Sequence, residues 1–92
     1  MRVIVDESAA RDLEHIARHI AVDNPSAAQT QIKKIRHVID QLAAFPALSR
    51  PGAVQGTRER VVAGTEYIIV FELWRKPSAI IVTGVVHGAR YR

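Results

Sequence analysis

The chain contains no cysteine among its 92 residues. This absence excludes disulfide bonds, zinc–thiolate sites and thiol nucleophiles, and it favours a reducing compartment. Aromatic residues are also scarce, with one Trp, two Tyr and two Phe. Trp74 beside Arg75 and Lys76 is a poor platform for stacking nucleic-acid bases, because such platforms use several aromatic side chains. We expect Trp74 to close the edge of the core instead.

Long apolar runs are missing as well. None approaches the roughly 20 residues that a membrane-spanning helix needs. The segment Met1–Asp6 is too short, and interrupted too early by an acid, to serve as a signal peptide. The apolar content of 48% is enough for one packed core. We therefore expect a cytoplasmic protein with one domain, residues 1–92, and no membrane segment.

Charge is unevenly distributed along the chain. Residues 1–49 carry six basic and six acidic side chains, whereas residues 50–92 carry seven basic and three acidic ones. The whole net charge of +4 therefore lies in the second half. A basic surface there predicts an anionic or acidic partner. Because a pI near 10.1 favours non-specific adhesion to nucleic acid, basicity alone does not predict a nucleic-acid function.

The first half predicts one strand and two helices. The β-branched run at residues 3–5 is typical of a strand. Apolar residues then recur at helical spacing over residues 8–22 and 25–44. Ser8 is the expected N-cap of the first helix and Asn24 that of the second. Because the link between the helices is short, we expect them to form an antiparallel hairpin.

The second half predicts three strands, at residues 58–62, 67–74 and 79–86. The last two contain uninterrupted apolar runs, which are typical of strands at the centre of a sheet. Gly84 within the final strand indicates a bulge or a close backbone approach. The element order predicts an α+β fold, β-α-α-β-β-β, with the helical hairpin packed on a small, twisted, mainly antiparallel sheet.

Cofactor and metal signals are weak. The sequence has no phosphate-binding loop and no dinucleotide fingerprint, so we expect no cofactor. His15 and His19 are four residues apart, the spacing of two ligands on one helix face. Nothing in the sequence supplies an obvious third ligand, so we expect two solvated histidines and no metal. Asp12 we interpret as a helix-start charge.

Basic residues of the second half are the main candidates for a functional surface. Arg58 and Arg60 are two apart on a predicted strand and share a face, while His87 and Arg90 follow the last strand. Arginines in these places suit phosphate, RNA or a carboxylate-rich protein, or they keep a strand edge solvated. Metal-free phosphodiester cleavage also needs a general base and a general acid. His87 and Tyr91 are the candidates for those roles.

Several segments together carry a resemblance to a known family. They are Asp23-Asn24-Pro25, Phe45-Pro46, Arg50-Pro51-Gly52, Gly56-Thr57-Arg58-Glu59, Gly64-Thr65-Glu66-Tyr67-Ile68 and His87-Gly88-Ala89-Arg90. In these segments, and over essentially its whole length, the chain resembles the ParE/RelE superfamily of toxins from type II toxin–antitoxin modules. The resemblance implies the β-α-α-β-β-β fold, the bacterial cytoplasm, and a small antitoxin that wraps the toxin in a hetero-oligomer.

The resemblance implies one of two activities, because members of the superfamily differ in what they do. RelE-type members are ribosome-dependent mRNA endonucleases with a basic sheet face, a basic residue on a central strand, and a tyrosine or histidine near the C-terminus. ParE-type members are associated with inhibition of DNA gyrase. In this chain Tyr67 or an adjacent apolar residue stands where the nucleases place an arginine, and residues 46–62 contain no lysine. We therefore expect a gyrase inhibitor without enzymatic activity.

Two alternatives stay open. One is a ribosome-dependent mRNA endonuclease, acting on mRNA in the ribosome through His87, Arg90 and Tyr91. The other is an inactive module that only binds antitoxin. The residues expected to contact the target are Arg58, Arg60, His87 and Arg90. The residues expected at the antitoxin interface are Ala28, Ile32, Ile35, Arg58 and Arg60, beside a groove suited to an acidic amphipathic helix and an extended segment.

Overall fold

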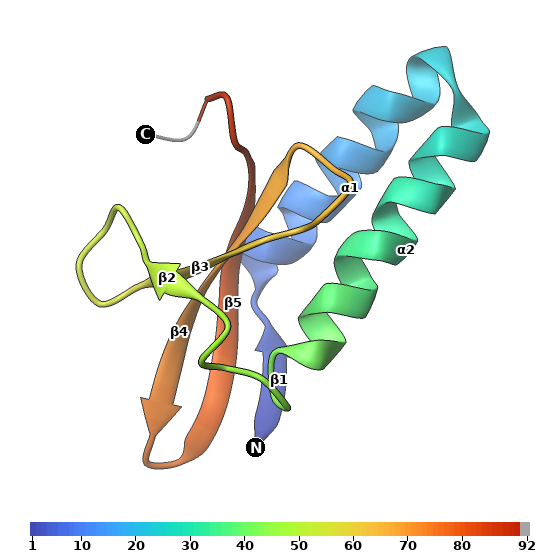
Figure 1. Ribbon diagram of the computed structural model, residues 1–92. Helices are drawn as coiled ribbons and strands as arrows, with labels where there is room; N and C mark the ends of the chain where they lie inside the picture. The colour runs from blue at the N-terminus through green and yellow to red at the C-terminus, as the bar shows by residue number, and fades with distance from the viewer. Residues whose placement is uncertain (91–92) are drawn as a thin grey trace.

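The computed structural model describes residues 1–90 and shows two helices on one face of a five-stranded sheet (Figure 1). The elements are β1 (Arg2–Val5), α1 (Glu7–Asp23), α2 (Pro25–Gln41), β2 (Arg50–Pro51), β3 (Arg58–Val61), β4 (Tyr67–Arg75) and β5 (Ser78–His87). The predicted α+β fold is confirmed, with β2 as an additional strand. Tyr91 lies outside the described residues, so its role stays a prediction.

The strands are ordered β1-β5-β4-β3-β2. β1 pairs with β5 in parallel, and the remaining neighbours are antiparallel. β4 and β5 are central, as their apolar runs predict. The sequence does not predict β2. Its two residues pair with Arg58 and Glu59 at one edge of the sheet. Such a short strand containing Pro51 is typical of a sheet edge, because proline cannot donate to the ladder.

Both helices begin at short polar caps. The prediction of Ser8 as the first N-cap is wrong, because α1 begins at Glu7 and the Asp6 carboxylate accepts a hydrogen bond from the Ala9 N–H at 2.8 Å. Asp6 directly follows β1, so the chain turns into the helix two residues earlier than expected. The Asn24 cap of α2 is confirmed by its bond from the Ala27 N–H at 3.0 Å.

The core lies between the helical hairpin and the sheet. α1 packs on β5 and α2 packs on β4. The buried side chains that meet there are Leu13 and Ile16 of α1, Ile35 and Ile39 of α2, Ile69 and Phe71 of β4, and Ile80 and Val82 of β5. Within residues 1–90, neither helix is long and apolar enough to cross a bilayer.

Trp74 does not close the core, which corrects the expectation from the sequence. Side chains along β4 alternate between the two faces of the sheet, and Trp74 comes three residues after the core residue Phe71. Trp74 therefore lies on the face opposite the helices, where it is 47% exposed. Its indole N–H donates to the Glu72 carboxylate at 2.9 Å. The polar edge of the ring therefore has a partner although the ring remains at the surface.

An irregularity in the β4–β5 ladder fixes the position of α1. The register shifts between Val70 and Phe71, beside Gly84 of β5. There the Asp12 carboxylate accepts a hydrogen bond from the Val85 N–H at 3.0 Å. A Cβ atom at Gly84 would lie 3.4 Å from the same carboxylate oxygen. The predicted bulge at Gly84 is confirmed, whereas the interpretation of Asp12 as a simple helix-start charge is wrong.

Candidate functional site

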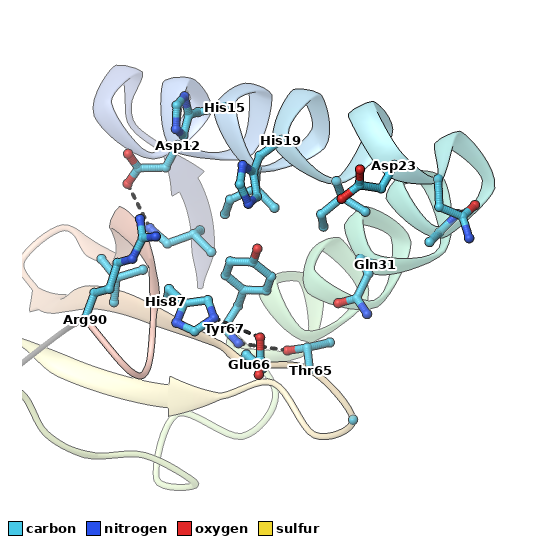
Figure 2. Close-up of a pocket in the computed structure, with 17 residues that line it drawn as sticks. Asp12, His15, His19, Asp23, Gln31, Thr65, Glu66, Tyr67, His87 and Arg90 are labelled. Atoms are coloured by element: carbon cyan, nitrogen blue, oxygen red, sulfur yellow. Dashed lines mark hydrogen bonds and ion pairs between the residues drawn. The ribbon is translucent and has the colours of Figure 1, made fainter.

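A cleft of about 920 Å³ lies between the helical hairpin and one end of the sheet (Figure 2). One wall is formed by α1 and the start of α2. The opposite wall is formed by the β3–β4 turn and the adjoining ends of β4 and β5. Ile16, Ile20 and Val85 supply apolar surface, and polar side chains surround them. A volume of this size suits a small ligand or several side chains of a protein segment.

Two rings at the base of the cleft pack against each other. Tyr67 and His87 are cross-strand partners on β4 and β5. Their ring centroids are 5.5 Å apart and the ring planes are nearly perpendicular, at 87°. This edge-to-face arrangement is a favourable geometry for aromatic pairs. Tyr67 therefore packs against the core and also lines the cleft.

Both ring nitrogens of His87 are engaged. Its Nε2 lies 2.8 Å from a carboxylate oxygen of Glu66, and its Nδ1 accepts a hydrogen bond from the Ala89 N–H at 3.2 Å. An accepting Nδ1 carries no proton, so Nε2 carries the proton and donates it to Glu66. The Gly88 N–H also donates to the Glu66 carbonyl oxygen at 2.7 Å. These bonds fasten the turn after β5 to the β3–β4 turn.

The cleft is acidic. Its formally charged lining residues among those described are Asp12, Asp23, Glu66 and Arg90, which together give a net charge of −2. This sign is opposite to that of the strand-rich half as a whole. Binding of a partner in the cleft is therefore favoured when the partner carries basic groups that lie near the acidic rim.

The remaining polar lining includes two histidines and one glutamine. His15 and His19 are exposed on α1 and line the cleft. Within residues 1–90, no cluster of three His, Cys, Asp or Glu side chains is arranged to hold a metal. The side-chain oxygen of Gln31 is buried and has no hydrogen-bond partner in the described part of the chain. Because a buried acceptor normally has a partner, Gln31 offers a bonding position to a molecule in the cleft.

The predicted target-binding residues lie in two separate places. His87 and Arg90 line the cleft, whereas Arg58 and Arg60 do not. These two arginines share a face of β3, as predicted. They pair with Phe71 and Ile69, so this is the helix side of the sheet.

The two arginines of β3 have different surroundings. Arg58 donates to the hydroxyl and carbonyl oxygens of Ser49, at 2.6 and 3.1 Å. It thereby fixes the segment that follows α2. One terminal nitrogen of Arg60 is buried and, among residues 1–90, has no hydrogen-bond partner. Whether either arginine meets a target or an antitoxin stays a prediction.

The predicted antitoxin stripe on α2 is mostly part of the interior. Ile35 is 0% exposed in the core, Ala28 is buried, and only Ile32 is half-buried. A regular apolar stripe identifies the face by which a helix packs, and here that face lies mainly inside the molecule. The cleft residues that sequence reasoning missed include Asp23, Gln31 and Glu66. Asp23 and Glu66 belong to segments that carry the family resemblance, but no local pattern marks these residues as part of one site, because the fold brings them together from three segments.

Two solved structures share this fold. The structure described as the chromosomal ParDE toxin–antitoxin system from P. aeruginosa superposes with a TM-score of 0.85 at 22% identity, covering 95% of each chain. The RelBE2 toxin–antitoxin complex from Mycobacterium tuberculosis gives a TM-score of 0.69 at 18% identity, covering 94% of this chain and 95% of that one. At these identities the likeness shows the fold alone, which is that of the RelE/ParE toxins.

Sequence comparison narrows the class to one family. The model described as "ParE toxin of type II toxin-antitoxin system, parDE" matches residues 3–91. A Sinorhizobium fredii (strain NBRC 101917 / NGR234) protein named "Putative toxin Y4kP" is 38% identical over 74 residues, which cover 80% of this chain and 77% of the relative. The chain therefore belongs to the ParE toxin family of type II toxin–antitoxin systems, and the resemblance predicted from its sequence is confirmed.

Proposed function

We propose that this chain is a toxin that inhibits DNA gyrase by binding it, and that a cognate antitoxin neutralises the toxin. Family membership supplies the class of protein. The observation that favours binding of a target over cleavage of RNA is the hydrogen bonding of His87, the residue that would act as the base of a nuclease site.

A nuclease without metal needs a general base with a free acceptor nitrogen or oxygen. His87 offers none, since Nδ1 accepts from Ala89 and Nε2 donates to Glu66. The resemblance places a nuclease arginine at the position of Tyr67 or of an adjacent apolar residue, and Tyr67 packs edge-to-face against the same ring. Arg58 is committed to Ser49. These arrangements support binding of a target over cleavage of RNA.

The cleft has the features of a binding site for an antitoxin segment. The two similar solved structures are described as a toxin–antitoxin system and a toxin–antitoxin complex. In this chain the cleft combines the apolar wall of Ile16 and Ile20 with an acidic rim. Such a site suits an amphipathic antitoxin segment whose apolar side chains enter the cleft and whose basic side chains meet the rim. An acidic part of the same antitoxin would meet Arg58 and Arg60.

The direct test is a supercoiling assay with purified toxin, gyrase, relaxed plasmid and ATP. The proposal predicts that supercoiling falls as toxin is added, that broken DNA accumulates on gyrase, and that the antitoxin reverses both effects. Gyrase activity that is unchanged at micromolar excess of toxin would contradict the proposal.

The same protein should be tested on translating ribosomes. We expect ribosome-bound mRNA to remain intact. Cuts at defined codon positions that disappear with His87→Ala would establish the ribosome-dependent endonuclease instead. Tight antitoxin binding by a chain that inhibits neither gyrase nor growth would establish the inactive binding module.

A further inference from the structure

The loop that joins β2 to β3 projects away from the helical hairpin (Figure 1). It contains no residue that lines the cleft. Near its tip Val54 is 63% exposed, although valine is more often buried. The loop is therefore a separate surface feature, on a different part of the molecule from the cleft.

A buried carboxylate holds this loop. Glu59 is only 5% exposed and is the one charged side chain that the fold buries within residues 1–90. One oxygen accepts from the Arg50 guanidinium at 3.0 Å, and the other accepts from the Ala53 N–H at 3.1 Å. Burial of a carboxylate is costly unless charge and hydrogen bonds compensate it. Here the Ala53 N–H comes from the loop and the Arg50 guanidinium comes from the residue directly before it, so the loop shape and the buried carboxylate stabilise each other.

The loop backbone closes on itself at its base. The Gly52 N–H donates to the Thr57 carbonyl oxygen at 2.8 Å. The Thr57 N–H and hydroxyl both donate to the Val54 carbonyl oxygen, at 3.1 and 2.6 Å. A Cβ atom at Gly52 would collide with the Thr57 hydroxyl oxygen. Only glycine fits this contact, and the tip is held in one shape.

A buried ion pair often stabilises a fold no better than packed apolar residues would. In this chain the buried charge supports an exposed tip that no helix covers. Fixing a loop in advance lowers the entropy cost of binding, and recognition residues are commonly held on loops by a rigid scaffold. An exposed tip that is fixed in this way is suited to recognition of a partner.

We propose that the segment Pro51–Thr57 is a target-recognition loop, positioned by Glu59, whose tip residue Val54 enters an apolar recess on the protein that the toxin inhibits. Arg50 is exposed beside the loop, so the recess is expected to have acidic groups at its rim. We assign the loop tip to the inhibited protein and not to the antitoxin, because the loop contains no residue that lines the cleft proposed for the antitoxin. The inference rests on the proposed function in one respect, namely that the toxin acts by binding a protein.

The first test replaces Val54 with aspartate. The matched control is Leu48→Asp, because Leu48 is 59% exposed on the segment before β2 and lies outside the proposed loop. Val54→Asp should weaken inhibition of gyrase about tenfold or more, as removal of a central anchor does, whereas Leu48→Asp should not. Both variants should bind antitoxin as the wild type does, which also shows that they fold.

The second test addresses Glu59 as a positioning residue. Glu59→Gln keeps an acceptor for Ala53 but removes the charge that pairs with Arg50. We expect faster hydrogen exchange at the amides of Gly52 and Thr57, weaker inhibition, and unchanged antitoxin affinity. Inhibition that is unchanged in both Val54→Asp and Glu59→Gln, with the loop amides mobilised in the latter, would overturn the inference.

A growth assay separates failure of this inference from failure of the gyrase proposal. If the wild type arrests growth without affecting gyrase and without cutting mRNA, the target is another protein and the loop is still tested by growth. Loss of arrest with Val54→Asp but not with Leu48→Asp then supports the loop. Equal arrest by both variants overturns it, and a wild type that arrests nothing overturns both proposals.

Discussion

Asp12 and Glu59 are carboxylates that each accept a hydrogen bond from a backbone N–H group in a distant or irregular segment. Asp12 bonds to Val85 at the bulge of β5, and Glu59 bonds to Ala53 in the loop before β3. Neither role has a local signal, because the sequence does not show which backbone groups the sheet leaves unpaired. The sequence predicts the Gly84 irregularity, but the partner that satisfies it comes from another element.

Asp12→Ala should destabilise the protein, because it leaves the Val85 N–H without its acceptor. Loss of a partner for a buried donor costs about 1–3 kcal/mol. Urea unfolding measures the change in the free energy of unfolding. Glu14→Ala is the matched control, since Glu14 is exposed on the same helix, and surface changes usually stay within about 0.5 kcal/mol. Equal stability of the two variants would show that the Asp12 bond contributes nothing.

The tautomer of His87 is a second residue-scale prediction. The bond from the Ala89 N–H to Nδ1 requires that the neutral ring carry its proton on Nε2. Nitrogen-15 NMR of the labelled protein, at a pH where the ring is neutral, should show a protonated Nε2 and an unprotonated Nδ1. A protonated Nδ1 would leave Nε2 free as a base and remove the structural support for a binding function over a nuclease function.

At the scale of elements, apolar periodicity predicts both helices and the central strands. Pro25 and the Asn24 cap mark the break between the helices, so that boundary is predicted correctly. The start of α1 is not, because Asp6 and Ser8 are both good N-cap residues and the sequence does not show where β1 ends. The two-residue strand β2 is not predicted for a related reason, because its pairing depends on how the following loop closes.

The cap assignment makes an element-scale prediction. Asp6→Ala should cost about 0.5–2 kcal/mol, the usual effect of removing an N-cap side chain. Ser8→Ala should have little effect, because Ser8 lies within the first turn and Asp6 makes the bond to Ala9. Chemical denaturation of the two variants checks this difference. A larger loss of stability for Ser8→Ala than for Asp6→Ala would show that Ser8 is the N-cap, as the sequence first indicates.

At the scale of the whole molecule, the sequence shows only part of the charge distribution. The excess of basic residues in the second half can be read from the chain, and it is the reason that Arg58, Arg60 and Arg90 are candidates for a functional surface. The acidic cleft is not readable, because its carboxylates come from both halves. Asp12 and Asp23 belong to the neutral half, and only folding brings them near Glu66.

This charge distribution predicts how the antitoxin associates. Asp23→Lys should slow association and change its dependence on salt, because attraction to a basic antitoxin segment is lost. Glu14→Lys makes the same change of charge on α1 at an exposed position that does not line the cleft, and it should have a smaller effect. Stopped-flow binding at two ionic strengths measures both rates. Identical rates for the two variants would place the antitoxin outside the cleft.

The central claim is that this toxin inhibits DNA gyrase and does not cut mRNA. The most direct measurement is induction of the chain alone in a sensitive bacterial host, with the DNA-damage response and bulk protein synthesis followed together. The account predicts that the damage response rises while translation is initially intact. Immediate arrest of translation with cut mRNA, and no damage response, would contradict it.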